Sequence, residues 1–384
     1  MIYLNNAATS QHKPECVIEA VTQAMREYGS AARGANVSSL EPSRMVTALR
    51  AEIAGLFGFS YPERVVFTMN ATQALNTVLF GLFRPGDHVI ATDLDHNAVL
   101  RPLYELRKQS VAADFVPADR RGCIDIRGFE RLIRPETKAI VCTHASNLTG
   151  NVLDIEAIAA VARQHRILFI LDASQTAGAF PIDMEKTEID ILCFTGHKSL
   201  LGPQGTGGLL VRPGIGIRPL IMGGTGIRSF EDTQPEAYPE HLEAGTLNSH
   251  GLAGLLAAVR FIRETGIETI HDRESALARQ FCQGVREIPG TVLYGDFPAD
   301  FRQRAPIAAM NIAGMDSSEF ADILSADYDI QVRAGGHCAP RMHRALGTDK
   351  TGAVRFSFGY YNTPEEVAAA VQAVREIAEE AGRC

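Results

Sequence analysis

One lysine of this sequence stands where it could bond covalently to a carbonyl compound. Lys198 lies in the glycine-rich stretch of residues 195–203, directly after the mostly apolar run 189–194. A lysine amine is a poor nucleophile while it is charged, and partial burial or a nearby cation lowers its pKa enough to allow Schiff-base formation. We therefore take Lys198 as a candidate cofactor lysine, although a lone Gly-His-Lys sequence is more often part of a surface loop.

A carboxylate follows another apolar run. Residues 167–171 are all apolar and lead into Asp172, which predicts a carboxylate at the carboxyl edge of a buried parallel strand, where open α/β sheets bind ligands. A carboxylate there needs a cation or strong donors, and the protonated pyridine nitrogen of pyridoxal phosphate is one such partner. An acidic helix cap explains Asp172 equally well, because the small residues Ala173 and Ser174 follow it.

A phosphate site is predicted at a turn between a strand and a helix. Residues 65–68 are expected to form a strand and residues 73–83 a helix, with Ala71 and Thr72 in the turn between them. The start of a helix presents unpaired N–H groups and the positive end of a dipole, so it can bind an anion. Ala71 and Thr72 are therefore candidates for holding a cofactor phosphate, and an ordinary N-cap by Thr72 is the alternative.

Two further side chains suit roles beside a bound cofactor. His96 follows the predicted strand 88–92 at the same expected edge of the sheet. An imidazole there can stack on a flat ring and transfer protons near neutral pH, although a solvated loop histidine is the more common case. Arg355 lies in the alternating run 354–358, and a guanidinium group suits bidentate capture of a substrate carboxylate. A surface ion pair explains Arg355 as well.

One cysteine has the surroundings of a reactive thiol. Cys338 lies in a glycine-containing loop beside His337 and near Arg333 and Arg341, and positive neighbours favour the nucleophilic thiolate. The seven cysteines are odd in number, scattered and without a Cys-x-x-Cys pair, which argues against a disulfide framework and a structural zinc site. The other six lie mainly in apolar surroundings, at positions 16, 123, 142, 193, 282 and 384.

The elements that must position these residues alternate between strands and helices. Between residues 52 and 211, helix-length segments alternate with six short apolar runs, at 65–68, 88–92, 138–143, 166–171, 189–194 and 207–211. This alternation predicts an α/β domain whose mostly parallel sheet is covered by helices on both faces. Longer helices over 252–264 and 275–285, with strands near 308–312 and 354–358, predict a separate, smaller α+β domain.

We therefore divide the chain into a large domain, residues 1–250, and a small C-terminal domain, residues 251–384, which carries the Cys338 loop and Arg355. A helix over 14–28 is expected to pack on one of these domains, the small one included, or on a partner subunit. Asp154 is expected to cap a helix over 155–165. Thr363, followed by proline and glutamate, is expected to begin a last helix that ends near residue 381.

Composition excludes several classes of protein. The 384 residues are 46% hydrophobic, enough for a large core and two domains. The 45 acidic and 37 basic residues are spread along the chain, for a net charge of −8, so no basic stripe is available for nucleic acid. The N-terminus lacks a basic segment followed by an apolar one, and no run approaches the roughly 18 apolar residues of a membrane span. We expect a soluble, cytoplasmic protein with neither nucleic acid nor membrane as a partner.

These motifs, in this order, resemble the class V aminotransferase group of fold-type I pyridoxal-phosphate enzymes, and within it the cysteine desulfurase and selenocysteine lyase branch. The resemblance runs from Tyr-Leu-Asn-Asn-Ala-Ala-Thr at 3–9 to Tyr-Tyr-Asn-Thr at 360–363. It implies a seven-stranded, mostly parallel sheet and pyridoxal 5'-phosphate as the cofactor. It also implies roles for the residues at matching positions: Lys198 as the Schiff-base lysine, Asp172 at the pyridine nitrogen, Gln175 at the phenolic oxygen, His96 stacked on the ring, and Ala71, Thr72, Thr195 and His197 at the phosphate.

The resemblance further implies a homodimer, because Thr246 matches a residue that reaches the phosphate of the neighbouring subunit. Cys338 matches the cysteine that takes sulfur from the substrate, while Arg355 and Asn147 match the carboxylate clamp. The short loop around Cys338 is similar to that of the group II desulfurases. The expected reaction converts L-cysteine to L-alanine and leaves a persulfide for a sulfur-acceptor protein.

Selenocysteine lyase, aminotransferase and other carbon–sulfur lyase activities are the alternatives on the same scaffold. A non-catalytic binding protein would be expected to lack the lysine or the aspartate, and Lys198 and Asp172 are both present. Three positions depart from the pattern. Asn5 and Asn36 stand where relatives often have aspartate and histidine, and Ala71 replaces a frequent threonine. Asn36, expected at the substrate, bears on substrate choice.

Overall fold

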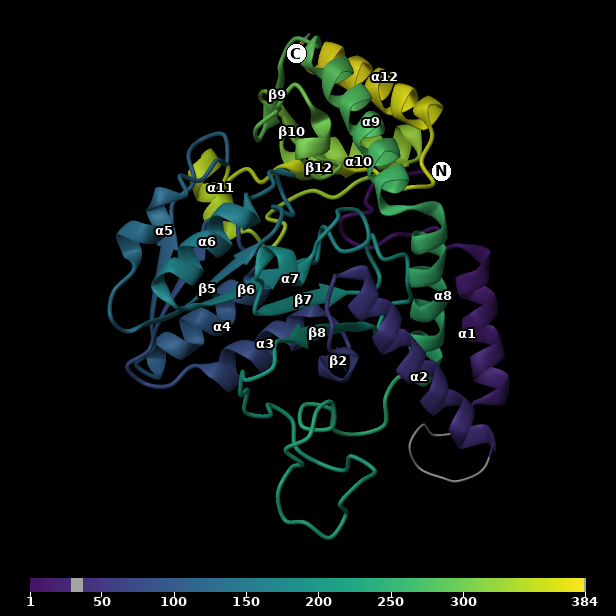
Figure 1. Ribbon diagram of the computed structural model, residues 1–384. Coiled ribbons are helices and arrows are strands. Elements are labelled where there is room, and N and C mark those ends of the chain that lie inside the picture. Colours follow the sequence, from purple (N-terminus) through teal and green to yellow (C-terminus); the bar gives the residue numbers. More distant parts are fainter. Residues whose placement is uncertain (29–36, 383–384) are drawn as a thin grey trace.

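The larger part of the molecule is built on a seven-stranded sheet (Figure 1). In the computed structural model, which describes residues 1–28 and 37–382, the spatial order is β2 (Val65–Thr68), β8 (Gly207–Val211), β7 (Ile191–Thr195), β6 (Leu168–Asp172), β5 (Thr137–Thr143), β3 (His88–Thr92) and β4 (Ala112–Val116). Among these strands, β8 alone is antiparallel to its neighbours, β2 and β7. The expected α/β fold with a mostly parallel sheet is confirmed.

Helices cover both faces of the sheet, which is why its central strands are apolar on both sides. In β5, Ile140 and Cys142 belong to the core on one face and Ala139 and Val141 to the core on the other, and all four are fully buried. α3 (Ala71–Leu82) and α4 (Asn97–Lys108) cover the face of Ala139. The opposite face packs against α2 (Val37–Leu56), α5 (Arg127–Leu132), α6 (Ile155–His165), α7 (Met184–Thr187) and α8 (Ser249–Thr265).

The apolar runs locate most of this sheet. The predicted strands coincide with β2, β3 and β8 and differ by one or two residues at the ends of β5, β6 and β7. The sequence pattern does not reveal β4, because this strand lies at the edge of the sheet and carries a half-exposed aspartate, Asp114, whose carboxylate lies 3.2 Å from His88 Nε2. A strand that is only partly buried does not need a continuous apolar run.

A second, three-stranded antiparallel sheet lies at the top of Figure 1, in the order β12 (Val354–Ser357), β10 (Ile307–Ile312) and β9 (Thr291–Tyr294). It packs against α9 (Ile267–Arg286), α10 (Ser317–Tyr328) and α12 (Pro364–Ala381) around the rings of Phe281, Phe320 and Phe356. The buried apolar residues of α8 belong to the core beneath the large sheet. From Leu277 onward, the buried apolar residues of α9 belong to the core of the small sheet. The division at residue 250 stays a prediction.

Two helix starts show how the sequence sets local structure. The Asp154 side chain accepts a hydrogen bond from the Ala157 N–H at 2.9 Å and caps α6, as expected. Thr363 and Glu366 form the reciprocal bonds of a capping box at the start of α12, which ends at Ala381. In contrast, α9 begins at Ile267, well before the predicted start at 275. Two of the three buried residues in its first turns, His271 and Glu274, are polar, so no apolar stripe marks this part of the helix in the sequence.

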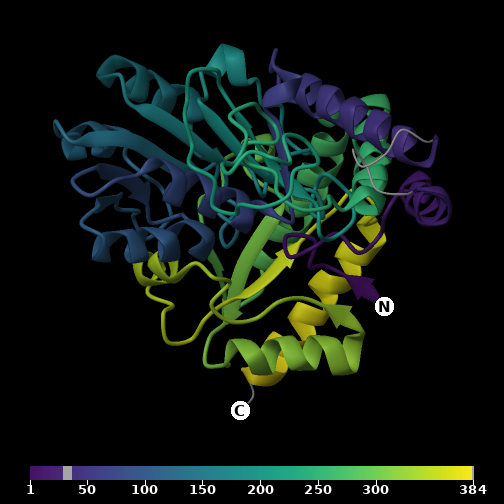
Figure 2. The ribbon, with the colours of Figure 1, turned by 90° about the horizontal axis from the view of Figure 1, so that it is seen from below.

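The N-terminal segment contacts both parts of the molecule. Its first strand, β1 (Ile2–Tyr3), pairs in parallel with β11 (Ile330–Gln331), beside the small sheet. α1 (Glu15–Glu27) then runs alongside α8 (Figures 1 and 2). The stretch between β1 and α1 therefore crosses from the small sheet to the large domain, close to the carboxyl ends of the parallel strands. The remaining short helices are η1 (Pro62–Arg64), η2 (Phe301–Gln303) and α11 (Pro340–Leu346).

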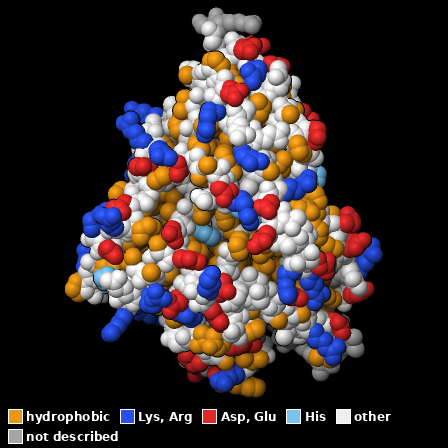
Figure 3. All heavy atoms as spheres, turned by 45° about the horizontal axis from the view of Figure 1, so that its top comes forward, with side chains coloured by type: hydrophobic (Ala, Val, Ile, Leu, Met, Phe, Trp, Pro, Cys, Tyr) orange, Lys and Arg blue, Asp and Glu red, His pale blue; other side chains and the backbone are white. Residues whose placement is uncertain are grey.

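A long segment without helix or strand, residues 212–248, projects from the body at the bottom of Figure 1. It exposes several large apolar side chains: Leu220, Ile221, Met222, Ile227 and Phe230. On the face shown in Figure 3, acidic and basic side chains are interspersed, as the similar numbers of the two signs imply. Within residues 1–28 and 37–382, none of the helices has the length and apolar character needed to cross a membrane.

Candidate active site

Most of the predicted site residues line one cavity of about 440 Å³. Strands β5, β6 and β7 end at Thr143, Asp172 and Thr195, and His96 follows β3. Because the carboxyl ends of parallel strands meet at one edge of a sheet, these side chains converge although they are far apart in the sequence. The predicted residues in the lining are Ala71, Thr72, His96, Asn147, Asp172, Gln175, Thr195, His197 and Lys198.

The other predicted residues are distributed differently. Cys338 and Arg355 lie close to the cavity, since both act electrostatically on the Lys198 amine. Thr246 is exposed and lines a separate hollow with Arg50 and Glu243. Asn36 lies outside the described residues. The structure of this single chain therefore brings the predicted substrate and sulfur residues next to the cavity and leaves Thr246 apart from it.

The Lys198 amine is poised between its charged and neutral forms. Burial lowers the pKa of Lys198 to about 8, the Asp172 carboxylate opposes this shift, and the charges of Arg355 and Arg333 reinforce it. An ordinary lysine is almost entirely charged at this pH. The neutral fraction of Lys198 is correspondingly larger, and the neutral amine is the form that can attack a carbonyl carbon.

Asp172 is the buried carboxylate of the cavity. Burial raises its pKa, while donors from Ser174 and the charge of Lys198 act in the opposite direction. Ser174 donates its backbone N–H to Oδ1 at 2.9 Å and also its hydroxyl group. Residues 173–183 form turns and no helix begins there, so the alternative of a helix cap is wrong. A cation bound in the cavity would favour the ionised form of Asp172 and be stabilised by it.

An anion site lies at the start of α3. The N-cap is Asn70, whose side chain accepts from the Gln73 N–H at 2.9 Å, so the interpretation of Thr72 as the N-cap is wrong. The first helical residues, Ala71 and Thr72, present their N–H groups at the positive end of the helix. Thr195 Oγ1 is buried beside them in the cavity and has no hydrogen-bond partner among the described residues. Helix amides and an unpartnered hydroxyl fit a phosphate group.

The imidazole of His96 is fixed in one tautomer. His96 is the N-cap of α4, and its Nδ1 accepts from the Ala98 N–H at 3.0 Å, so the ring proton of the neutral form resides on Nε2. Burial lowers the pKa of His96 to about 4, and the positive charge of Lys198 adds to the shift. A neutral, oriented ring suits stacking on a flat cofactor. His197 is neutral for the same reason, with a pKa of about 4.

Sequence reasoning missed the carboxylate that holds this edge of the sheet together. Asp95 is fully buried and accepts from the backbone N–H and hydroxyl of Thr92 and from the Thr143 N–H, at 2.7–2.8 Å. It therefore joins the ends of β3 and β5 and sets the position of the adjacent His96. Burial raises the pKa of Asp95 to about 7. The signal was an aspartate directly before a histidine at the end of an apolar strand.

The loop that carries Cys338 is attached to the large domain through its carbonyl groups. Asn147 Nδ2 donates to the His337 carbonyl at 2.7 Å, and the Asn97 N–H donates to the Cys338 carbonyl at 2.8 Å. His337 and Cys338 both have φ in the left-handed region, 48° and 57°, which costs free energy for residues other than glycine. Arg341, expected near the thiol, is paired with Asp93 at 2.6 Å, and its effect on the thiol stays a prediction.

Asn147 has its amide orientation set by this contact. Because Nδ2 faces the His337 carbonyl, Oδ1 faces away, and it is buried without a partner among the described residues. An amide oxygen is an acceptor and does not bind a carboxylate. In this conformation the substrate carboxylate would meet Arg355 rather than Asn147 Oδ1. A clamp role for Asn147 stays a prediction, and positioning of Cys338 is the role that its contacts favour.

We expect Asn147→Ala to increase the reactivity of Cys338 several-fold, because the loop loses a buried hydrogen bond that restrains it (about 1 kcal/mol or more). The rate of Cys338 alkylation by iodoacetamide measures this without substrate. The buried Cys282 serves as the internal control and should stay unreactive in both proteins. An unchanged alkylation rate with a raised KM for substrate would instead identify Asn147 as a carboxylate ligand only.

Arg355 is a buried cation without an acidic partner. It is 1% exposed and donates to the Asn147 carbonyl at 2.8 Å and to Asn5 Oδ1 at 3.1 Å. Burial and the neighbouring charge of Arg333 lower its pKa to about 9. Within residues 1–28 and 37–382, none of the acidic side chains forms an ion pair with it, so the interpretation as a surface ion pair is wrong. A buried, uncompensated guanidinium strongly favours binding of an anion such as a carboxylate.

A mostly parallel sheet with a lysine of lowered pKa, a buried aspartate and an anion site at its carboxyl edge defines an α/β enzyme that uses an anionic, aldehyde-bearing cofactor. Comparison with known proteins agrees. The sequence profile of the family described as Aminotransferase class-V matches residues 2–370. The chain belongs to the class V aminotransferase family, whose members depend on pyridoxal phosphate.

Its relatives narrow the comparison. A probable cysteine desulfurase of Methanothermobacter thermautotrophicus is 34% identical, over 98% of this chain and 94% of the relative. A probable cysteine desulfurase of Synechocystis is 33% identical, over 96% of this chain and 88% of the relative. Among solved structures, the apo cysteine desulfurase of Thermococcus onnurineus is 31% identical, with a TM-score of 0.90 over 99% of this chain and 95% of the other. The Escherichia coli cysteine desulfurase CsdA is 29% identical, with a TM-score of 0.88 over 98% and 94%.

Proposed function

We propose that this protein is a pyridoxal-phosphate-dependent cysteine desulfurase that converts L-cysteine to L-alanine and carries the sulfur as a persulfide on Cys338. The observation that carries the proposal is the convergence of a thiol and a buried, uncompensated guanidinium on the cavity that contains Lys198. A desulfurase needs all three groups: an amine for the cofactor, a cation for the substrate carboxylate, and a nucleophile for the sulfur.

The role proposed for each residue follows from the family resemblance and is supported by its position in or near the cavity. Lys198 would hold the cofactor, with Asp172 at its ring nitrogen, His96 against its ring and Ala71, Thr72, Thr195 and His197 around its phosphate. Gln175, whose Nε2 donates to the Ala7 carbonyl at 3.2 Å, would lie at the phenolic oxygen. The bound cofactor would supply an electron-accepting ring that stabilises negative charge at the substrate Cα.

The protein's own groups account for substrate binding and proton transfer. Arg355 binds the substrate carboxylate and so orients the cysteine side chain toward the Cys338 loop. The neutral Lys198 amine accepts the Cα proton at Nζ and returns it later. His96, with its proton on Nε2, is placed to donate a proton and to take it back.

The thiolate of Cys338 is the nucleophile of the sulfur transfer. Its Sγ attacks the substrate Sγ, a sulfur–sulfur bond forms, and the substrate carbon–sulfur bond breaks. The electron pair of that bond stays with the carbon skeleton, which takes up a proton and leaves as alanine. Cys338 is left as a persulfide, and a thiol of an acceptor protein removes the outer sulfur. No external oxidant or reductant is consumed.

Mass spectrometry of the protein after incubation with cysteine tests the proposal. We expect one added sulfur atom on the peptide that contains Cys338, together with alanine in solution. Cys338→Ala should lose both products with cysteine, by about 10³-fold or more, because the acceptor nucleophile is gone. If that variant still produced alanine from cysteine, the persulfide mechanism would be contradicted. Activity on selenocysteine alone would assign a selenocysteine lyase, and a requirement for an amino-group acceptor would assign a transaminase.

We also propose that the enzyme is a homodimer. The apolar side chains of residues 220–230, with Phe230 fully exposed, and the exposed Thr246 lie on the segment that projects from the body. Large exposed apolar patches mark association surfaces, and Thr246 would then reach the cofactor phosphate of the partner subunit. All six described cysteines are free, which supports our placement of the enzyme in the reducing cytoplasm.

Phe230→Asp should shift the protein from dimer to monomer, with a dissociation constant raised about tenfold or more, because it places a charge in an apolar interface. Sedimentation at several protein concentrations measures the change. Val292→Asp is the matched control, since Val292 is an exposed apolar residue of β9 in the other part of the molecule. Equal dissociation of both variants would argue against an interface at residues 220–230.

A further inference from the structure

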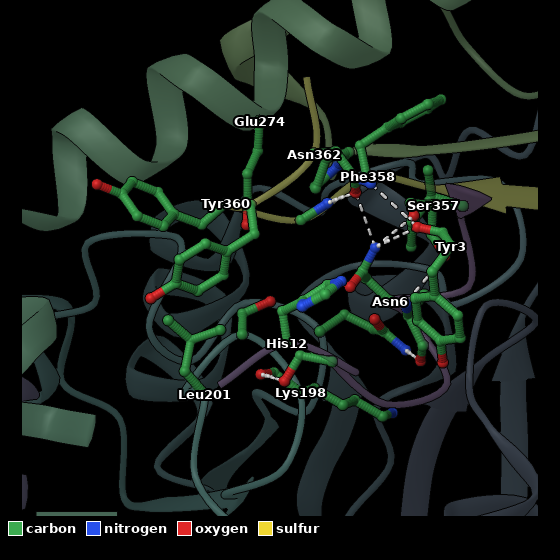
Figure 4. Close-up of a pocket in the computed structure, with 18 residues that line it drawn as sticks. Tyr3, Asn6, His12, Lys198, Leu201, Glu274, Ser357, Phe358, Tyr360 and Asn362 are labelled. Carbon is green, nitrogen blue, oxygen red and sulfur yellow. Dashed lines mark hydrogen bonds between the residues drawn. The ribbon is translucent and has the colours of Figure 1, made fainter. Parts of the chain in front are cut away.

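A second cavity lies on the other side of the catalytic lysine. It shares Lys198 and Gln175 with the cofactor cavity. The N-terminal segment supplies Asn6, Ser10 and His12, and the loop after β12 supplies Tyr360 and Tyr361. Figure 4 shows Lys198 and Leu201 at the bottom of this cavity and Glu274 entering it from α9 above. None of the roles proposed for the desulfurase reaction uses this space.

One carboxyl oxygen of Glu274 is buried at this cavity without a hydrogen-bond partner among the described residues. Its side chain is 3% exposed, although it is a carboxyl group. The Tyr360 N–H is a hydrogen-bond partner of the carboxylate, whereas Oε2 is buried and has no partner among the described residues. A buried, unsatisfied carboxylate oxygen is costly. Burial raises the pKa of Glu274 to about 8, so the carboxyl group holds a proton at neutral pH while the cavity has no cation.

Two polar side chains that line the cavity with Glu274 already have partners. The Tyr3 hydroxyl donates to the Thr9 carbonyl at 2.9 Å. Asn6 Nδ2 donates to the Ser357 carbonyl and to Asn362 Oδ1, both at 3.0 Å. Glu274 is also the only acidic side chain in the lining. Among the buried side-chain nitrogen and oxygen atoms of the described lining, Glu274 Oε2 alone lacks a hydrogen-bond partner. A ligand that supplies a positive charge would let the carboxyl group lose its proton, so that this oxygen could accept an N–H hydrogen bond.

The walls suit the body of an organic cation. The rings of Tyr360 and Tyr361 lie 5.2 Å apart in an edge-to-face arrangement, and His12 lies 6.3 Å from Tyr361. Aromatic faces attract cations, and a buried carboxylate beside them adds charge and direction. Lys198, in the shared wall, lies next to any molecule that enters.

We propose that this cavity is a binding site for a small organic cation, an ammonium or guanidinium compound whose N–H groups donate to Glu274 and whose remaining atoms lie against Tyr360 and Tyr361. The site adjoins that of the cofactor, with which it shares the wall formed by Lys198 and Gln175. Its carboxyl group is Glu274, whereas the cofactor and the substrate carboxylate use Asp172 and Arg355. Binding converts Glu274 to its ionised form, because a cation at Oε2 offsets the burial that keeps it protonated.

Calorimetric titration of the holoenzyme with methylguanidinium chloride tests this proposal. The probe has donors and a positive charge, and its nitrogen atoms are too weakly nucleophilic to react with the cofactor. We expect saturable binding and, at neutral pH, release of about one proton for each probe bound, measured from the difference between two buffers of unequal ionisation enthalpy. Glu274→Gln keeps the shape of the side chain and should weaken binding about tenfold or more and abolish the proton release.

Two further variants keep the result interpretable. Glu268→Gln removes an exposed carboxylate from the same helix and should behave as the wild type. Tyr361→Leu alters a side chain that is 38% exposed, so it should fold normally and bind the probe more weakly even if Glu274→Gln does not fold. No saturable binding by the wild type, or equal binding by Glu274→Gln, would overturn the proposal and leave a cavity that holds water. These readouts do not depend on desulfurase activity, so failure of either proposal leaves the other intact.

Discussion

Lys198→Ala is expected to lose the visible absorption of the bound cofactor and to form alanine from cysteine about 10³-fold more slowly or not at all. The substitution removes both the amine that holds the cofactor and the group that accepts the Cα proton. Absorbance of the purified protein after addition of pyridoxal phosphate measures the first effect, and alanine formation measures the second. An unchanged spectrum would refute the cofactor assignment.

Lys13→Ala is a demanding control for this result. Burial lowers the pKa of Lys13, like that of Lys198, to about 8, and its amine donates to Ser10 and to the His197 carbonyl. A lowered pKa by itself therefore does not distinguish the two lysines. Only Lys198 also lines the cavity with Asp172 and the anion site. Lys13→Ala should retain the visible absorption, and its loss there would show that the wrong amine has been assigned.

The pH dependence of cofactor loading follows from the same pKa. Below about pH 8 the Lys198 amine is charged, and above it the amine is neutral and nucleophilic. Loading of the apoprotein should therefore accelerate as the pH rises through about 8, at a lower pH than for an ordinary lysine. Stopped-flow absorbance over a pH series gives the midpoint. A midpoint near that of a free lysine would contradict the buried environment of the amine.

Asp172→Asn is expected to reduce alanine formation about 10²-fold or more while the cofactor stays bound. A neutral amide cannot stabilise a positive charge on the cofactor ring, so the ring accepts electrons less readily. Single-turnover rates with cysteine, together with the visible spectrum, separate the loss of chemistry from the loss of binding. If the variant released the cofactor, but the molecules that retained it formed alanine at the wild-type rate, Asp172 would have a purely structural role.

Asp190→Asn provides the matched control. Asp190 is also a mostly buried carboxylate whose pKa is raised by burial, and it accepts from the Phe169 N–H at 2.8 Å. It lies at the opposite end of β7 from the cavity, just before the strand begins. The variant should lower thermal stability and leave the rate per folded molecule unchanged. A similar fall in rate for both variants would mean that the loss of any buried carboxylate slows the reaction, so the effect would not be specific to Asp172.

The fold could be predicted well where burial imposed a pattern. A strand buried on both faces must be apolar along its length, so β3 and β8 stand out in the sequence. The edge strand β2 stands out as well, because Val65, Val66 and Phe67 are all buried. The other edge strand, β4, is buried at only two of its five positions, and with Asp114 in its centre it is not recognisable. The capping signals of Asp154 and Thr363 succeeded for a different reason, because side-chain caps act within three residues.

The candidate site divides in the same way. By itself the sequence determined the residue types that the chemistry needs. It also determined the ends of the strands, and because parallel strands place their carboxyl ends together, these bring Asp172, Thr195 and His96 to one edge of the sheet. Only the tertiary structure decided the environment of each group. Lys198 has a lowered pKa because of burial by the surrounding chain and charges from residues far away in sequence. Asn147 is oriented by a carbonyl 190 positions further on, and Glu274 became notable only because folding buried it without a partner for one oxygen. Local patterns specify elements, whereas desolvation and long-range hydrogen bonds exist only once the chain is packed.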